Sequence, residues 1–328
     1  MPLRPLVVLI LLAFSSSGFA WKDDQIVVGC SVLDLKGELI KTLPGRLCQF
    51  FENGSYLTAI EAKLKLIDKN NSVLWEIPLV AHHQMEMSAD RKRVLVLARS
   101  KVTIKKKELE QDVFHVVNLE GNVLHETTAR ELMKQINRKE EELTNKELSH
   151  FNSFHEIPPL ENTDSLPDYI RAGNFVLNAR FLGTFFVSSD LKKVLHFLPL
   201  KNSHLHNTHD VQVLSSGKLL YFNNRKAENN VQELSSSIDL YDFSSQKTES
   251  LFEGIPKQIF FSPDGGSVQQ LDSEHIVFSH FLSGTFIYSL RDKKILSNIY
   301  KTHFAQGTFF PVQNAKVQNL HAFLKFWK

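Results

Sequence analysis

The sequence is poor in cysteine and has no strong excess of charge of either sign. Its only two cysteines, Cys30 and Cys48, exclude a dense disulfide framework, and their spacing is not a metal motif. In an oxidising compartment they can form one disulfide, and two separate thiols are the alternative. The 38 basic and 36 acidic residues give a net charge of +2. Because nucleic acids and anionic membranes need broad basic surfaces, we expect small molecules or proteins as partners, and no nucleic acid.

Long apolar runs are also missing. The run Leu6–Phe14 is too short to span a membrane, which takes about 20 apolar residues, and no later segment approaches that length. Arg4 precedes this run and Gly18-Phe19-Ala20 follows it, which is typical of a secretory signal peptide with its cleavage site. We expect residues 1–20 to be a signal peptide and residues 21–328 to be a periplasmic or secreted domain without a membrane span. A retained anchor is the alternative.

One hairpin pattern recurs along the chain at a spacing of roughly 50 residues, which indicates an internal repeat. Each copy has an alternating strand, a polar turn and a second alternating strand. The six copies are Val32–Ile40, Leu66–Trp75, Val116–His125, Val187–His196, Asp239–Thr248 and Tyr288–Leu296. Further short strands lie between the copies, for example Asp210–Leu214 and Lys218–Phe222 on either side of a Ser-Ser-Gly turn.

About four strands in each unit are the content of a propeller blade. A single blade would expose one face, and packing blades around a ring buries that face and leaves few free edges. We therefore predict an all-β fold, a six-bladed β-propeller. A β-sandwich is the alternative, but it gives no reason for one hairpin pattern to recur six times.

One segment departs from the strand pattern. Residues 128–148 have a helical pattern, with Thr128 and Glu131 at capping-box spacing and with Leu132, Met133 and Ile136 on one side. We predict a short helical insertion here. Because it ends directly before His150, it is either a lid beside a site or a solvated excursion on the surface.

Several of the 14 histidines fall at matching places in different repeats. The pair His82-His83, then His150, and then His209 each occur where a hairpin has ended and the first strand of the next blade begins. Since the first strand of a propeller blade is the innermost one, we expect these four side chains to meet at one mouth of the central channel. The alternative is that each histidine only binds a turn carbonyl.

Two chemistries could use such a cluster. The run His204-Leu205-His206-Asn207-Thr208-His209 is similar to the zinc-binding run of metallo-hydrolases, except that Thr208 occupies an aspartate position. The strand and helix alternation of that hydrolase fold is missing, so we predict a site without metal and keep a metal-dependent hydrolase as the lesser alternative. The other chemistry is group transfer, in which one imidazole attacks an electrophilic centre and a second one moves a proton.

Several short motifs, in order along roughly His82 to Arg291, resemble the bacterial arylsulfotransferases, also called aryl-sulfate sulfotransferases. The matching segments are His150-x-Asn152-Ser153, Asn174–Arg180, Thr208-His209-Asp210 with Ser216–Asn224, and Ser262–Gln269. The resemblance implies a periplasmic six-bladed propeller that moves a sulfuryl group from a phenolic sulfate donor to a phenolic acceptor without a nucleotide cofactor.

The resemblance also implies roles for single residues. His209 would be the nucleophile that becomes sulfo-histidine. His150, Asn152 and Arg180 would bind the sulfuryl oxygens, since a guanidinium, an amide and a protonated imidazole can together meet the negative charge of a transferring SO3 group.

The phenolic proton would be handled by His82 or His83, and the resemblance does not choose between them. A non-catalytic propeller that serves as a binding or assembly module in the cell envelope is the alternative function. It predicts that replacing His209 by alanine leaves the biological activity unchanged.

Overall fold

The computed structural model describes residues 25–28, 30–34, 39–45, 47–51, 53–104, 106–138, 150–180, 182–199, 208–224, 236–253, 266–270, 274–280 and 284–300. These residues form 23 strands and one short helix, which confirms the predicted all-β class. The predicted signal peptide, residues 1–20, lies outside them. Within the described part of the chain, no helix has the length and apolar character needed to cross a membrane.

Most strands belong to five antiparallel sheets of four strands, and each sheet is built from consecutive strands of the chain. The five sheets are β4 (Cys48–Phe50), β5 (Tyr56–Ile60), β6 (Lys63–Ile67) and β7 (Val73–Pro78); β8 (Val80–Met87), β9 (Arg93–Ile104), β10 (Lys107–Asn118) and β11 (Val123–Thr128); β12 (Phe151–Glu156), β13 (Phe175–Ala179), β14 (Gly183–Val187) and β15 (Val194–Pro199); β16 (Thr208–Val213), β17 (Leu219–Asn223), β18 (Ser237–Asp242) and β19 (Lys247–Glu253); and β20 (Ser267–Gln270), β21 (His275–His280), β22 (Gly284–Ser289) and β23 (Lys294–Tyr300).

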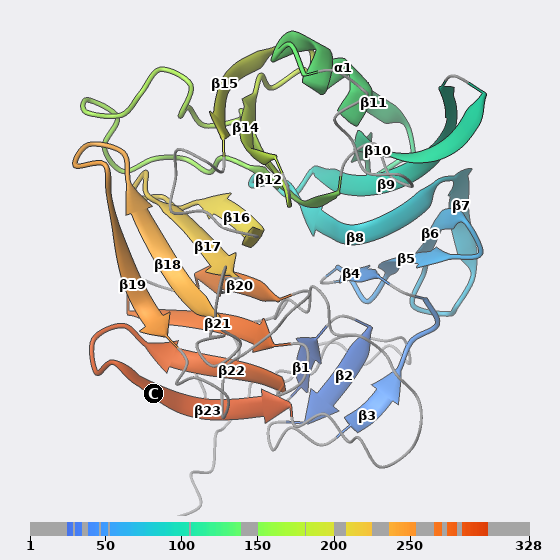
Figure 1. Ribbon diagram of the computed structural model, residues 1–328. Coiled ribbons are helices and arrows are strands. Elements are labelled where there is room, and N and C mark those ends of the chain that lie inside the picture. Colours follow the sequence, from blue (N-terminus) through green and yellow to red (C-terminus); the bar gives the residue numbers. More distant parts are fainter. Residues whose placement is uncertain are drawn as a thin grey trace, which may run out of the picture.

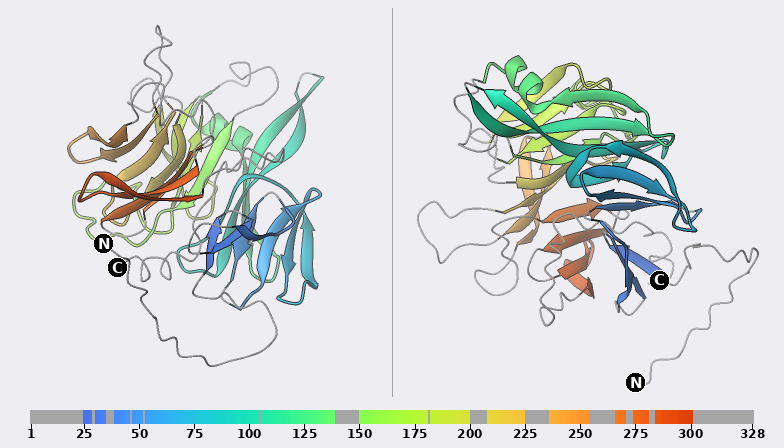
Figure 2. Two further views of the ribbon diagram at one scale, coloured as in Figure 1. Left: turned by 90° about the horizontal axis from the view of Figure 1, so that it is seen from below. Right: turned by 90° about the vertical axis from the view of Figure 1, so that its right-hand side faces the viewer.

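The sheets follow one another in chain order around a common centre, so the predicted propeller is confirmed (Figure 1). The first strand of each four-stranded sheet lies toward the centre, and the fourth lies toward the outside (Figure 1). The second and third strands of sheet β8–β11 are longer than the others and form an arm that projects from the ring (Figure 2). Since Val80 pairs with Arg99, the continuation of β9 to Ile104 extends beyond the start of β8, the end at which His82 lies.

The predicted number of six blades is wrong, because the described residues form five four-stranded blades. A sixth sheet contains only β1 (Gln25–Val28), β2 (Ser31–Asp34) and β3 (Leu39–Thr42). Strands β2 and β3 contain the first hairpin copy, which corresponds to the outer two strands of the other sheets, such as β6 and β7. Among the described residues this sheet therefore has no innermost strand. The recurring hairpin forms only the outer two strands of a blade, so six hairpins do not establish six complete blades.

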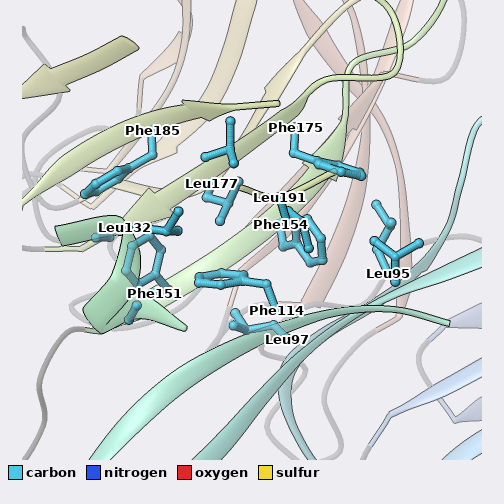
Figure 3. Packing of buried hydrophobic residues seen from close by; sticks show 14 residues of the cluster. Leu95, Leu97, Phe114, Leu132, Phe151, Phe154, Phe175, Leu177, Phe185 and Leu191 are labelled. Atoms are coloured by element: carbon cyan, nitrogen blue, oxygen red, sulfur yellow. The ribbon is translucent and has the colours of Figure 1, made fainter. Parts of the chain in front are cut away.

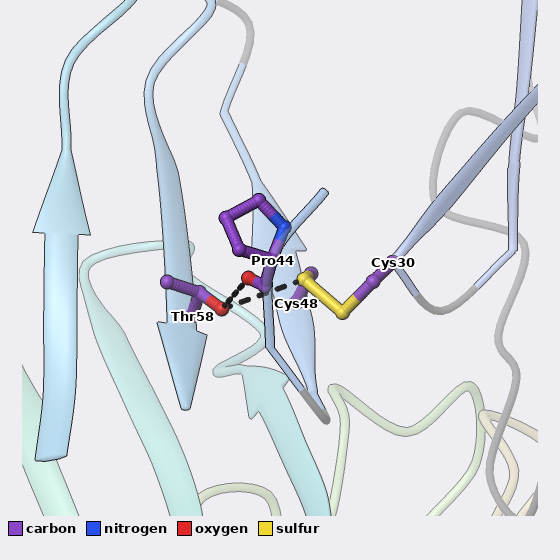
Figure 4. The surroundings of a disulfide bond; sticks show 4 residues. All are labelled: Cys30, Pro44, Cys48 and Thr58. Atoms are coloured by element: carbon purple, nitrogen blue, oxygen red, sulfur yellow. Dashed lines mark hydrogen bonds between the residues drawn. A yellow bond between two sulfur atoms is a disulfide. The ribbon is translucent and has the colours of Figure 1, made fainter. Parts of the chain in front are cut away.

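A disulfide joins Cys30 to Cys48 and decides between the two alternatives left by the sequence (Figure 4). It links the turn before β2 to the first residue of β4, so it ties the three-stranded sheet to the neighbouring blade. The hydroxyl of Thr58 lies 3.7 Å from Cys48 Sγ and donates a hydrogen bond to the carbonyl oxygen of Pro44 at 2.6 Å (Figure 4). The disulfide thus lies against ordered polar contacts inside the first four-stranded blade.

Aromatic side chains fill the space between sheets β8–β11 and β12–β15 (Figure 3). Phe114 is fully buried, and its ring centroid lies 4.9 Å from that of Phe151 and 5.4 Å from that of Phe154. Both pairs have edge-to-face geometry, which contributes about 0.5–1.5 kcal/mol per pair beyond the burial of area. Phe151 and Phe154 belong to an innermost strand, so this packing fixes the strand that follows His150.

The helix α1 (Ala129–Gln135) begins as predicted and ends earlier. The capping box is confirmed, because the Glu131 N–H donates to Thr128 Oγ1 at 3.2 Å and the Thr128 N–H donates to Glu131 Oε2 at 2.9 Å. The predicted extent to residue 148 is wrong at residues 136–138, since Asn137 adopts a left-handed φ of 55°, a conformation that ends helices. Residues 139–149 lie outside the described residues.

The described part of the insertion lies on the outside of the ring (Figure 1). The side chain of Gln135 donates to the carbonyl oxygen of Lys192 at 3.0 Å and accepts from the N–H of Val194 at 2.8 Å. These bonds fasten α1 to the outer hairpin of the next blade, which makes this part of the insertion a contact between blades.

Candidate functional site

Three innermost strands, β8, β12 and β16, contain a β-bulge near their first residues. The pairing with the second strand shifts between Ala81 and Met85, between Phe151 and Ser153, and between His209 and Gln212. Two bulge residues have a left-handed backbone, with φ of 61° at His83 and 48° at Asp210. Because a bulge re-aims side chains, simple alternation does not predict the directions of the side chains in these segments.

The structure brings three of the predicted histidines together from two blades. The ring centroids of His82 and His83 lie 3.9 Å apart, and His150 lies 5.0 Å from His83 and 6.5 Å from His82. We call these three residues the histidine cluster. These contacts show that the beginnings of β8 and β12 lie close together; that His209 joins them at one mouth of the channel stays a prediction.

Burial governs the acid–base behaviour of this cluster. Desolvation lowers the pKa of His82, although the hydrogen bond and charge of Asp112 raise it in opposition. The pKa of His83 is held well below its ordinary value, first by burial and then by the neighbouring His82, His150 and His209. Both imidazoles are therefore biased toward the neutral form, which can accept a proton.

His209 lies on β16 within electrostatic reach of the cluster, since its charge contributes to the lowered pKa of His83. It is 3% exposed. Its Nδ1 donates a hydrogen bond to the side-chain oxygen of Asn224, which is fully buried directly after β17. This bond fixes the tautomer, so Nε2 keeps its lone pair and can act as a nucleophile.

Arg180 follows β13 directly and lies beside the cluster. Its backbone N–H donates a hydrogen bond to the carbonyl oxygen of His150 at 2.8 Å. That bond places the beginning of β12 and the end of β13 next to each other, as their antiparallel pairing requires. The fold thus brings the backbone of Arg180 next to that of His150.

Asn152 is buried in a polar network between two blades. Its amide donates to the carbonyl oxygen of Thr208 at 2.8 Å, and its oxygen accepts from the amide of Asn178 at 2.9 Å. The Asn178 oxygen accepts in turn from the hydroxyls of Thr184 and Thr208, at 3.2 and 3.0 Å. Asn152 therefore holds β12 against the residue before His209. The carboxamide of Asn152 also has a second N–H besides the one that donates to Thr208.

Asp112 was not among the predicted site residues, and the structure places it at the base of the cluster. It lies on β10, is 1% exposed, and accepts from His82 Nε2 at 3.1 Å. Its second oxygen accepts from the backbone N–H of Phe151 at 2.9 Å. In the sequence, Asp112 is a single acidic residue directly before an apolar stretch, a pattern that is common at the ends of strands. This pattern gives no reason to pair Asp112 with a histidine 30 positions away.

A second polar chain that the sequence did not reveal runs inside the ring. His155 has Asp210 Oδ1 2.6 Å from its Nε2 and Glu86 Oε2 2.7 Å from its Nδ1. The Gln84 oxygen accepts from the N–H of Phe154 at 2.7 Å, and the second Asp210 oxygen accepts from Val268 N–H, also at 2.7 Å. These bonds join four blades. They hold the innermost strands, and hence the histidines at their beginnings, in fixed positions.

The predicted metal run is only partly described, because residues 204–207 lie outside the described residues. Among the residues that are described, no group of three or more His, Cys, Asp or Glu side chains has a geometry that could hold a metal ion. His209, the last residue of the run, instead bonds to Asn224.

Comparison with known proteins adds one assignment. The family model described as Arylsulfotransferase (ASST) matches residues 51–300, which contain every strand of the five four-stranded blades except β4. No curated protein sequence matches the chain.

Solved structures are similar to this chain only at low sequence identity. A protein of unknown function from Bacteroides caccae has 12% identity and a TM-score of 0.49, and the match covers 83% of this chain and 91% of that one. The Pan2 WD40 domain of Neurospora crassa has 9% identity and a TM-score of 0.45, with 91% and 76% covered. At these TM-scores the likeness supports no argument about function.

Proposed function

The chain belongs to the arylsulfotransferase family, and we propose that it transfers a sulfuryl group from a phenolic sulfate donor to a phenolic acceptor through a sulfo-histidine at His209. The observation that supports this most is the contact among His82, His83 and His150, within electrostatic reach of His209. Members of this family act on small phenolic molecules, and the proposed reaction needs no cofactor.

In the first step, the lone pair on Nε2 of His209 attacks the sulfur atom of the donor. The N–S bond forms while the bond between sulfur and the phenolic oxygen breaks. The phenolic oxygen leaves with the electron pair and takes a proton from the protonated form of His82 or His83. The three sulfuryl oxygens carry the negative charge, which Arg180, His150 and the amide of Asn152 stabilise.

The second step reverses the first with another phenol. The acceptor hydroxyl gives its proton to the same neutral histidine, and its oxygen attacks the sulfur atom. The N–S bond breaks, and its electron pair returns to Nε2 of His209. The buried, low-pKa character of His82 and His83 suits this step, because a neutral imidazole is the proton acceptor.

We propose further that the protein works in the periplasm or outside the cell. The Cys30–Cys48 disulfide supports this location, because such bonds persist in oxidising compartments.

The experiment that tests the function uses 4-nitrophenyl sulfate with and without phenol as the acceptor. The purified wild type should release nitrophenol mainly when phenol is present, and H209A should release none. A folded wild type without turnover would contradict the proposal and favour the non-catalytic binding module. Gln212, on the same strand, offers a matched control: Q212A should retain transfer activity.

A further inference from the structure

The two histidines best placed to carry the transfer have chemically different partners. Nε2 of His82 donates to the carboxylate of Asp112 at 3.1 Å, and Nδ1 of His209 donates to the carboxamide oxygen of Asn224. All four side chains are at least nine-tenths buried, with exposed fractions of 8%, 1%, 3% and 0%. Each partner fixes one tautomer, which leaves Nδ1 of His82 and Nε2 of His209 as the reactive nitrogens.

The difference between the two partners is one of charge. A buried carboxylate stabilises the imidazolium that forms when its histidine accepts a proton. A carboxamide oxygen orients the ring equally well but adds no full negative charge that would favour protonation. A histidine that carries a proton therefore benefits from a carboxylate partner. A histidine that acts as a nucleophile must keep its lone pair, so it benefits from a carboxamide partner.

We propose that Asp112 and Asn224 are positioning residues that assign the two roles, Asp112 making His82 the proton carrier and Asn224 keeping His209 the neutral nucleophile. This inference rests on the function proposed above and resolves the choice between His82 and His83. His83 has the more strongly lowered pKa, and burial is the main cause, so His83 is the poorer proton carrier of the two.

The surroundings of His82 make Asp112 decisive. The charges that act on it from the neighbouring elements are Asp112 on β10, Arg99 on β9 and His150 before β12. Burial, Arg99 and His150 all lower the pKa of His82, and only Asp112 raises it. Removing the carboxylate charge therefore leaves burial, Arg99 and His150, which all oppose the protonation of His82.

The surroundings of His209 are different. Its ring bonds to Asn224, which is neutral, and its charge lowers the pKa of His83. The carboxylate of Asp210, the next residue, is directed to His155 and to the backbone N–H of Val268. Replacing Asn224 by aspartate would thus introduce a carboxylate directly at Nδ1, where the structure has placed an amide.

The test is the pH dependence of the first half-reaction, measured as the single-turnover release of phenol from an aryl sulfate. The wild type should give a bell-shaped profile, because His209 must be neutral and His82 must be protonated. N224D should move the acid limb to higher pH, since the new carboxylate raises the pKa of His209. D112N should move the alkaline limb to lower pH, since His82 then loses its proton more readily.

A second readout separates proton transfer from simple damage to the fold. With 4-nitrophenyl sulfate the departing phenolate is stable and needs little protonation, whereas 4-methylphenyl sulfate needs a proton. D112N should therefore lose about 100-fold more rate with the methyl donor than with the nitro donor, a size typical of general acid catalysis. N224D should slow both donors to the same degree.

The controls are E108Q, on the same strand as Asp112, and N118D, at the end of that strand, which should leave both limbs in place. Unshifted limbs in D112N and N224D, or equal loss with both donors in D112N, would overturn the assignment. If D112N does not fold, the donor comparison is made with H82Q, for which the same 100-fold contrast is expected. A wild type without any phenol release would instead overturn the proposed function itself.

Discussion

The backbone N–H of Phe151 donates a hydrogen bond to Oδ2 of Asp112 across the boundary between two blades, at 2.9 Å. The other oxygen of this carboxylate binds His82, so one buried side chain holds both an innermost strand and a candidate catalytic imidazole. The position of the histidine cluster therefore depends on a residue of the third strand of its sheet.

Replacing Asp112 by alanine should lower the free energy of unfolding by about 1–3 kcal/mol beyond the loss of the side chain alone, because two buried donors lose their acceptor. Urea unfolding of D112A beside E110A measures this, since Glu110 is exposed and lies two residues away on the same strand. Equal losses in the two variants would contradict the role of Asp112 between the blades.

Stability should fall as the pH falls below about 6.5, the ordinary pKa of histidine. Burial lowers the pKa of His82 and His83, so the unfolded chain binds protons in a pH range where the folded chain does not. Stability therefore rises with pH through this window. In H83N the increase of the unfolding free energy with pH should be smaller by up to about 1.4 kcal/mol per pH unit. Asparagine is chosen because it tolerates the left-handed backbone at this position.

Denaturant titrations at several pH values between 5 and 7 measure that slope. The matched control is H125N, on the outer strand β11, which should keep the slope of the wild type. Identical slopes in H83N and the wild type would contradict the burial of His83 as the cause.

Removing the disulfide should destabilise the chain by about 2–4 kcal/mol, because the unfolded chain regains the freedom of the loop between Cys30 and Cys48. The double variant C30S/C48S should match the reduced wild type in thermal unfolding. A variant as stable as the oxidised wild type would show that the bond adds nothing to the link between the first two sheets.

Arg180 should be sensitive to replacement by lysine, because a guanidinium donates two parallel hydrogen bonds to sulfate-type oxygens and an ammonium does not. R180K should lower the rate of sulfuryl transfer by about 100-fold or more, the cost usual for losing one donor to a developing anion. Steady-state rates of R171K, an exposed arginine in the preceding loop, provide the control. A rate equal to that of the wild type would place Arg180 outside the reaction.

The periodic part of the fold was predictable because its signal is local. Hairpins such as Leu66–Trp75 and Val187–His196 alternate apolar and polar residues on either side of a polar turn, and each forms the outer two strands of a sheet. The count of blades was not predictable in this way, since a hairpin says nothing of the inner strand that completes its sheet. Likewise, the charged residues after Ile136 favoured a longer helix, whereas the left-handed Asn137 ends it.

The histidine cluster was predictable because its members occupy equivalent positions at the beginnings of innermost strands. Asp112 and Asn224 were not, because each bonds to a histidine on another strand and beside a bulge that has no sequence signature here. Asn224 lies in a segment that the sequence had singled out, yet only the structure shows its hydrogen bond to His209.

Covalent transfer through His209 can be measured as the mass of the protein after incubation with an aryl sulfate donor in the absence of an acceptor. We expect one added SO3 group per chain, located on the peptide that contains His209, which disappears when phenol is added. No adduct in a preparation that turns over donor and acceptor, or an adduct on another residue that persists in H209A, would contradict it.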